Sequence, residues 1–116
     1  MLAKANRLLT ADDFRVTMRT GRKFSSGNLV IFLKRDLGNA QARFGFVVAK
    51  TVGNAVTRNL VKRRLRALAH RSMDLVPGGC NVVVRALPDA ATDDWNKLSI
   101  DFNGALSRAL DRGSQA

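Results

Sequence analysis

Apolar and polar positions along the chain predict strands that alternate with helices. Residues 28–35 hold the run Leu29-Val30-Ile31-Phe32-Leu33, whose β-branched and aromatic side chains are typical of a strand. A hairpin loop should follow at 36–39, because Asp, Gly and Asn favour tight turns. We expect 43–50 to be the antiparallel partner of this strand. One face of that partner would hold Phe44, Phe46 and Val48.

A third strand and three helices complete the predicted order α-β-β-α-β-α. The third strand covers 80–86 and follows a turn at Pro77-Gly78-Gly79. The first helix should run from an N-cap at Thr10 to about Thr20, with Gly21 as its C′ residue. Asp93 and Asp94 begin the last helix, as capping residues or, less simply, as a cation site. Its apolar stripe, which we assign to the core, is Trp95, Leu98, Phe102, Ala105, Leu106 and Ala109.

The helix between the second and third strands is strongly basic. A Gly53-Asn54 turn opens it and it should stop near Val76. Its core face comprises Val61, Leu65 and Leu68. Beside that face runs a stripe of Arg58, Lys62 and Arg66, with Asn59 and Arg63 extending it outward and Arg64 and Arg71 on the opposite flank. Like charges at this spacing repel each other, so we expect a polyanion as the partner. The free backbone N–H groups of the opening turn would also contact this polyanion, because the helix dipole is positive there.

Composition supports that interpretation. The chain of 116 residues carries a formal charge of +11, and no acid lies between Leu37 and Met73. Such a balance is typical of proteins that bind nucleic acid or an anionic membrane surface. No apolar run is long enough to span a membrane or to serve as a signal sequence, so we expect a cytoplasmic protein without a membrane partner. We expect a single domain over 1–116, with a basic arm at about 1–8 and a frayed tail at about 112–116.

The sequence lacks the residues of a protein nuclease. There is no Glu, and His70 and Cys80 are the only residues of their kinds. Cys80 alternates with valines and is assigned to the core, whereas His70 lies away from the core face, where it is either solvated or a donor to phosphate. A pair of general acid and base groups, or a carboxylate cluster for two metals, is therefore not expected. Binding is the predicted task.

Three motifs carry a resemblance to a known family. They are Asn-Arg-Leu at 6–8, Asp-Phe followed by Gly at 13–21, and the pattern G-N-A-V-x-R-N-x-x-K-R at 53–63. Together they make the chain similar to the bacterial ribonuclease P protein subunit. The resemblance implies a fold like the second domain of a ribosomal small-subunit protein, with a left-handed crossover through the basic helix. Generic strand chirality would instead give a right-handed crossover in about 98% of cases.

The resemblance also implies a function. In this family a catalytic RNA subunit, using Mg²⁺, removes the 5′ leader of precursor tRNA by endonucleolytic cleavage. The protein binds that RNA and the leader and broadens substrate acceptance, with no catalytic or metal-binding residue of its own and no further protein partner. The residues that would contact the catalytic RNA are Lys50, Gly53, Asn54, Arg58, Asn59, Lys62, Arg63 and Arg66. Those that would bind the leader are Phe14, Met18, Phe32 and Lys50.

Two positions depart from the family pattern, and two other functions remain open. Leu60 stands where an Arg is common, and Met18 where an aromatic is common, so one RNA contact and one stacking ring are in question. Phe14 and Met18 also lie at i, i+4 spacing, which equally suits packing of the first helix onto a sheet. A ribosomal or general RNA-binding protein would use the same basic helix without a leader cleft. An autonomous ribonuclease would cleave without an RNA subunit.

Overall fold

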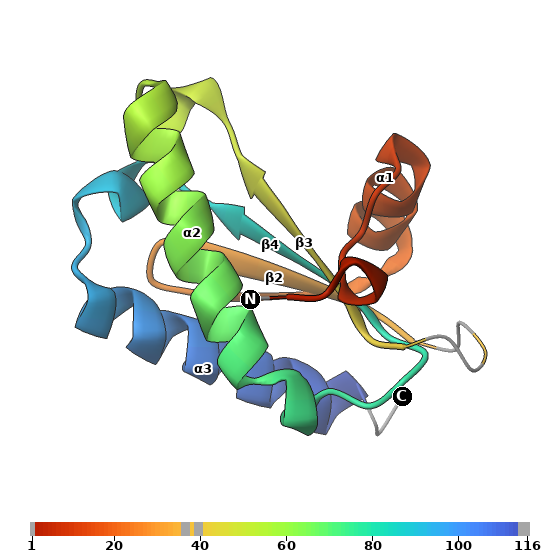
Figure 1. Ribbon diagram of the computed structural model, residues 1–116. Coiled ribbons are helices and arrows are strands. Elements are labelled where there is room, and N and C mark those ends of the chain that lie inside the picture. Colours follow the sequence, from red (N-terminus) through yellow and green to blue (C-terminus); the bar gives the residue numbers. More distant parts are fainter. Residues whose placement is uncertain (1, 36–37, 39–40, 114–116) are drawn as a thin grey trace.

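The computed structural model describes residues 2–35, 38 and 41–113, which form a four-stranded mixed sheet and three α-helices (Figure 1). The helices are α1 (Ala11–Thr20), α2 (Ala55–Arg71) and α3 (Trp95–Gly113). The strands are β1 (Arg22–Ser26), β2 (Leu29–Lys34), β3 (Arg43–Val48) and β4 (Asn81–Ala86). Short 3₁₀ turns lie at Lys4–Asn6, Lys50–Val52, Met73–Leu75 and Pro88–Thr92. The predicted α+β class is confirmed, with one strand more than the sequence pattern indicated.

The sheet order is β1-β2-β4-β3, so the predicted pairing of 28–35 with 43–50 is wrong. β4 lies between these strands, antiparallel to β2 and parallel to β3. The apolar run of β2 explains this, because Leu29 to Leu33 are buried on both faces of the sheet, as expected of an interior strand. Of the predicted hairpin loop, only Gly38 lies among the described residues at 36–40.

β1 is the strand that the sequence pattern missed. Its two basic residues suggested the end of a helix, yet it pairs antiparallel with β2 and forms a sheet edge. The connection is tight, and Gly27 at its start has a φ of 55°. A Gly-Asn pair between two extended segments is a known hairpin signal, so Gly27-Asn28 was the available clue.

Gly27 provides a test of this hairpin. A Cβ at this position would clash with the carboxylate of Asp101 and lie 2.6 Å from Nζ of Lys97. Gly27→Ala is therefore expected to lower the free energy of unfolding by about 1 to 3 kcal/mol, measured by urea denaturation. Gly38→Ala is the matched control, since Gly38 also has a positive φ of 76° but nothing within 4 Å of its Cβ. Equal losses in both variants would show that the contact with Asp101 contributes nothing.

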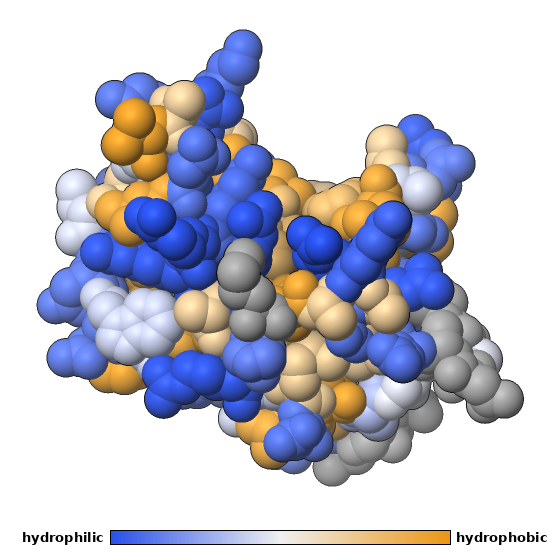
Figure 2. Space-filling view, in the orientation of Figure 1, coloured by the Kyte–Doolittle hydropathy of each residue, from blue (hydrophilic) through white to orange (hydrophobic). Residues whose placement is uncertain are grey.

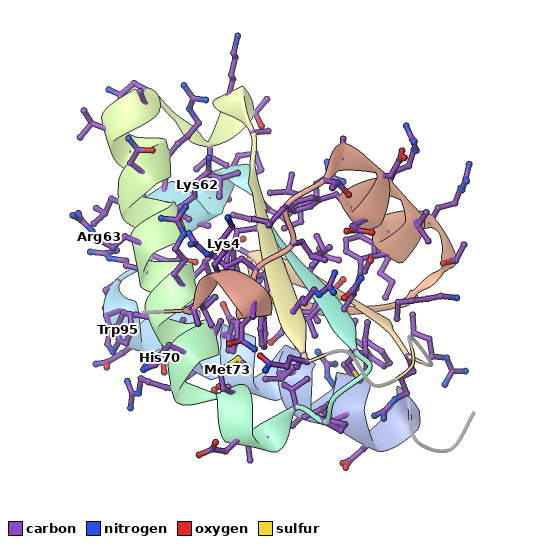
Figure 3. The ribbon with its side chains drawn as sticks, turned by 45° about the vertical axis from the view of Figure 1, so that its right-hand side comes forward. Lys4, Lys62, Arg63, His70, Met73 and Trp95 are labelled. Atoms are coloured by element: carbon purple, nitrogen blue, oxygen red, sulfur yellow. The ribbon has the colours of Figure 1, made fainter. Side chains whose placement is uncertain are left out.

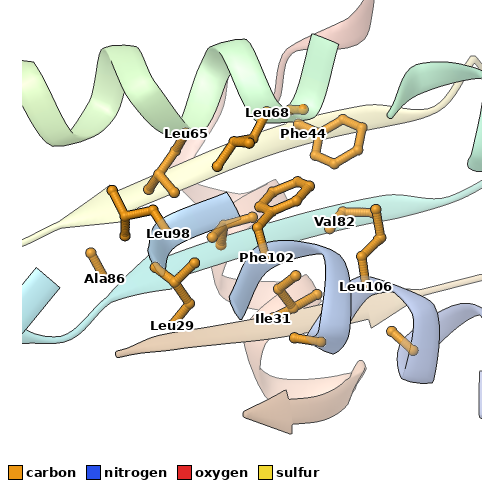
Figure 4. Packing of buried hydrophobic residues seen from close by; sticks show 14 of the residues in the cluster. Leu29, Ile31, Phe44, Leu65, Leu68, Val82, Ala86, Leu98, Phe102 and Leu106 are labelled. Atoms are coloured by element: carbon orange, nitrogen blue, oxygen red, sulfur yellow. The ribbon is translucent and has the colours of Figure 1, made fainter. Parts of the chain in front are cut away.

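Two apolar layers lie on the two faces of the sheet. The larger layer packs α2 and α3 against one face, where the α3 stripe from Leu98 to Ala109 is buried as predicted (Figure 4). Phe44 and Val48 of β3 belong to this layer, and Phe46 is only partly buried beside it. The smaller layer lies under α1 and contains Leu8, Val30, Phe32 and Val83. α1 therefore covers the face opposite α2 and α3.

The parallel strands β3 and β4 are joined through α2. With both strands pointing to the upper left in Figure 1 and α2 in front of the sheet, β4 lies to the left of β3. A connection that moves left while passing in front of the sheet is left-handed. The crossover thus has the hand that the resemblance implied and generic chirality opposed.

The predicted caps at Thr10 and Asp94 are confirmed, but α2 ends at Arg71 rather than near Val76, and a 3₁₀ turn at Met73–Leu75 follows it. The side chains of Thr10, Asn54 and Asp94 accept hydrogen bonds from backbone N–H groups in the first turns of α1, α2 and α3. Gly21 is not a left-handed C′ residue, because its φ is −77°. Glycine is needed there for space, since a Cβ would lie 2.5 Å from the carbonyl oxygen of Thr17 and 2.8 Å from that of Leu33.

The predicted basic arm is folded against the domain. Leu2 and Leu8 are both buried, and the backbone of Leu8 donates a hydrogen bond to the carbonyl of Phe44. The amide of Asn6 donates to the carbonyl of Ala42 at 2.9 Å. The first described residues thus extend the edge beside β3. Of the predicted frayed tail, residues 114–116 lie outside the described part of the chain, and α3 continues to Gly113.

Candidate nucleic-acid interface

The loop before α2 fixes where the basic helix begins. Lys50–Val52 forms a 3₁₀ turn after β3, and Gly53 follows with a φ of 158°. A Cβ on Gly53 would lie 2.9 Å from the Thr57 methyl group, so the turn packs directly onto the helix. The amide oxygen of Asn54 accepts the Thr57 N–H at 2.9 Å, which occupies one of the N–H groups that the sequence left free for an anion.

The Lys and Arg residues of α2 are exposed or half-buried, and none forms an ion pair with an acid in the described residues. Val61, Leu65 and Leu68 are buried, as predicted, which directs the remaining sides of the helix outward. No ion pair among residues 2–35, 38 and 41–113 involves α2. Figure 2 shows hydrophilic side chains gathered over this helix. In the described part of the chain, no acid neutralises the positive charge of α2, a state that favours a polyanionic partner.

Two cations on the far flank of α2 have structural contacts instead. Arg64 donates a hydrogen bond from Nη1 to the carbonyl of Asp93 at 3.1 Å. The guanidinium carbon of Arg71 lies 5.9 Å from the ring centroid of Trp95, a cation–π contact. Both contacts join α2 to the beginning of α3, so they orient the basic helix relative to the rest of the domain.

A hollow of about 590 Å³, which we call the outer hollow, lies on the side of α2 away from the core. Its lining includes Lys62 and three further predicted contacts of the catalytic RNA, together with residues outside that predicted set. Its lining is Asn59, Lys62, Arg63, Arg66, Ala67, His70, Arg71 and Trp95. Figure 3 shows Arg63, His70 and Trp95 along one side of α2, and Lys62 toward β3. The hollow is rimmed by basic groups and has no acid in its lining.

A second, more open hollow of about 810 Å³ lies between α1, the edge strand β3 and α2. We call it the cleft, and Figure 2 shows it as an indentation between two raised parts of the surface, with hydrophobic atoms at its base. Its lining is Ala11, Phe14, Arg15, Met18, Arg19, Phe46, Val47, Val48 and Lys62. An apolar floor with cations at the rim suits unpaired nucleotides, which need both stacking and charge neutralisation.

Phe14 and Met18, two of the predicted leader-binding residues, line the cleft, and the Phe14 ring packs directly on Gly45. A Cβ added to Gly45 of β3 would lie 2.5 Å from Cε1 of Phe14. The ring can therefore lie against the strand only because position 45 has no side chain. Both Phe14 and Met18 are half-buried, which leaves part of each side chain exposed to the cleft.

Phe32, the other predicted stacking ring, does not line the cleft. Its side chain is only 7% exposed and packs in the apolar layer beneath α1 with Val30 and Val83. β4 separates β2 from the edge strand β3, and Phe14 and Met18 of the cleft pack against the layer that contains Phe32. Its role is to support α1 from below, and Phe46 at the sheet edge is the second ring that lines the cleft.

The predicted catalytic-RNA contacts do not all line one hollow. Asn59, Arg63 and Arg66 line the outer hollow, whereas Lys62 lines both the outer hollow and the cleft. Arg58 is half-buried and lines neither, and its Nε is buried without a hydrogen-bond partner. The residues at the start of the helix, which also line neither, are Lys50, Gly53 and Asn54. Leu60 is half-buried and likewise absent from both linings.

Sequence reasoning missed several residues of these two hollows. Arg15 and Arg19 follow Phe14 on α1, and their position one turn apart beside the apolar face was the available signal. Arg85, the one charged residue of β4, lines neither hollow; it pairs with Val30 and Val47 and is exposed on the face that α1 covers. Trp95 was assigned to the core, but it is half-buried and also forms a wall of the outer hollow.

The chemistry available at these surfaces is binding chemistry. Among the described residues, no group of three His, Cys or Asp side chains is placed to hold a metal ion. No helix in that part of the chain is long and apolar enough to cross a membrane. On α3, away from both hollows, a hydrogen bond to the Asp101 carboxylate raises the pKa of Lys97. The cleft and the outer hollow thus offer cations, rings and apolar floors.

Comparison with known proteins agrees with this geometry. The Ribonuclease P family model matches residues 2–110. The chain belongs to the ribonuclease P protein family. The ribonuclease P protein component of an Arthrobacter species is 45% identical over 112 residues, which cover 97% of this chain and 82% of the relative. That of Kocuria rhizophila is also 45% identical over 112 residues, covering 97% and 98% of the two chains.

Solved structures support the fold. The RNase P protein of Staphylococcus aureus matches with a TM-score of 0.83 and 24% identity, over 91% of this chain and 96% of that one. The RNase P protein of Thermotoga maritima matches with a TM-score of 0.77 and 24% identity, over 88% and 96%. Family membership assigns the chain the role of the protein component of ribonuclease P, a ribonucleoprotein that processes tRNA.

Proposed function

We propose that this ribonuclease P protein binds the catalytic RNA through α2 and the 5′ leader of precursor tRNA through the cleft. The observation that carries the proposal is the position of Lys62, which lines both the cleft and the outer hollow. The catalytic RNA on the outer side of α2 and the single-stranded leader in the cleft would both contact the Lys62 side chain. The protein then holds the leader next to the RNA that cleaves it, and this broadens the range of precursors accepted.

The chemical step belongs to the RNA in this proposal. The side chains that line the two hollows include no carboxylate, whereas Mg²⁺ prefers carboxylate and phosphate oxygens. We therefore assign the Mg²⁺ used in leader cleavage to the RNA subunit. The proposal needs no second protein, and it places the complex in the cytoplasm.

Reconstitution tests the proposal against the alternative of an autonomous ribonuclease. The full chain alone is expected to leave precursor tRNA intact. With its cognate RNA subunit and Mg²⁺ it should give a mature 5′ end at physiological salt, scored on a gel by the size of the released leader. Leader release by the chain without RNA would overturn the division of labour. Unchanged activity of the RNA subunit on adding the chain would overturn the assisting role.

A further inference from the structure

The outer hollow exists because a small residue lies among large ones. Ala67 is exposed on α2, and the side chains one turn away on either side are those of Arg63, His70 and Arg71. All four line the hollow, so the methyl group of Ala67 forms a floor between longer walls. A larger residue at position 67 would fill the space without removing any charge.

Trp95 supplies a wall from a different helix, and its position is fixed. Asp94, next to it, caps α3 by accepting the Lys97 N–H at 2.8 Å. The preceding carbonyl, that of Asp93, accepts the hydrogen bond from Arg64. The Trp95 ring packs partly against the core and carries the Arg71 guanidinium 5.9 Å from its centroid. A preorganised ring and guanidinium of this kind offer planar surfaces on which a base can stack.

The lining combines two properties that one ligand shares. The floor and one wall are apolar or aromatic, whereas the rim carries Lys62, Arg63, Arg66 and Arg71 without an acid. A nucleotide has both a planar apolar base and an anionic phosphate. A duplex backbone would use the cations alone and leave the Trp95 wall without a partner.

We propose that the outer hollow binds one unpaired nucleotide of the catalytic RNA, with its base against the Trp95–Arg71 pair and its phosphate on Arg63 and Arg66. This inference rests on the proposed function, because it assumes that the catalytic RNA meets α2. It assigns a base-reading site to a helix otherwise expected to contact only phosphates. The leader is not the occupant, since its cleft lies on the other side of Lys62.

Trp95 reports directly on this site, because the chain has one Trp and no Tyr. Addition of the catalytic RNA to the full chain is expected to quench the Trp95 fluorescence. Ala67→Leu should abolish the quenching and weaken binding, measured by filter retention, by about tenfold, because stacking on a base is lost. The slope of log affinity against log salt should fall by at most about 0.7 to 0.9, the share of that nucleotide's phosphate, since no charge is removed from the protein. Trp95→Phe should retain most of the affinity because it keeps a ring.

Controls separate a base site from general effects. Ala55→Leu makes the same change on the same helix outside the hollow and should leave both quenching and affinity unchanged. An abasic version of a short unstructured RNA should quench Trp95 much less than the version with bases. Equal quenching by the two, quenching that survives in Ala67→Leu, or quenching by precursor tRNA but not by the catalytic RNA would overturn the inference. Leader removal by the reconstituted complex with Trp95 unquenched would refute this site alone and leave the proposed function standing.

Discussion

Replacement of Phe14 by Ala is expected to reduce the preference for precursor over mature tRNA by about tenfold. Mature tRNA has no leader, so a ring that stacks on a leader base contributes only to binding of the precursor. Stacking on one base is worth about 1 to 3 kcal/mol, and 1.4 kcal/mol corresponds to a factor of ten. The measurement is the ratio of the two dissociation constants for the reconstituted complex, with each tRNA titrated under the same salt and Ca²⁺ in place of Mg²⁺ to slow cleavage.

Two further variants show whether the ring acts through its position in the cleft. Gly45→Ala keeps the Phe14 side chain but adds a methyl group where its ring packs on β3. This variant should therefore also lower the preference for precursor over mature tRNA. Phe32→Leu alters a buried ring of the layer beneath α1 and should mainly lower the free energy of unfolding, by about 1 kcal/mol, with the ratio preserved. If Phe14→Ala keeps the full preference for precursor, the cleft does not bind the leader.

The sequence pattern predicted individual elements better than their pairing. The core faces of α2 and α3 follow from helical periodicity, and the caps at Thr10, Asn54 and Asp94 follow from local hydrogen bonding. Strand pairing is non-local, and nothing in residues 28–50 shows that β4 will lie between β2 and β3. β1 was missed because local charge at Arg22 and Lys23 outweighed the weak hairpin signal of Gly27-Asn28.

The candidate site was predictable only where it lies on one element. The basic stripe of α2 is visible as a spacing of three and four residues, and the residues of the family motif mark it further. The cleft depends on α1, β3 and α2 meeting at a sheet edge, and helical spacing cannot show that Lys62 faces both hollows. Trp95 fits the apolar period of α3, so only the packing of α3 against α2 shows that part of its ring lines a second surface.

Electrostatic repulsion within α2 is balanced unevenly around the helix. Repulsion between like charges at i, i+4 costs a few tenths of a kcal/mol per pair. The hydrogen bond from Arg64 to the carbonyl of Asp93 and the contact of Arg71 with the ring of Trp95 offset part of this repulsion. Lys62 and Arg66 have no acidic partner in the described residues. Arg64 and Arg71 thus have contacts that join α2 to α3, whereas Lys62 and Arg66 remain available to an anionic ligand.

Replacement of both Lys62 and Arg66 by Ala is therefore expected to weaken binding of the catalytic RNA by roughly a hundredfold, about tenfold for each lost contact between a cation and phosphate. Each lost phosphate contact should also reduce the slope of log affinity against log salt by about 0.7 to 0.9, so the double variant should lose about 1.4 to 1.8. Filter retention or fluorescence anisotropy over a series of salt concentrations gives both quantities.

The control for net charge is Lys23→Ala, because Lys23 is an exposed cation on β1, the sheet edge opposite β3. Its loss lowers the charge of the protein by one without touching α2, so the slope should hardly change. Lys62→Arg keeps the charge and should retain the slope of the unmodified chain. A double variant whose slope equals that of the unmodified chain would show that Lys62 and Arg66 do not contact phosphate. Comparable losses for Lys23→Ala and Lys62→Ala would mean that the RNA responds to the total charge of the protein rather than to the geometry of α2.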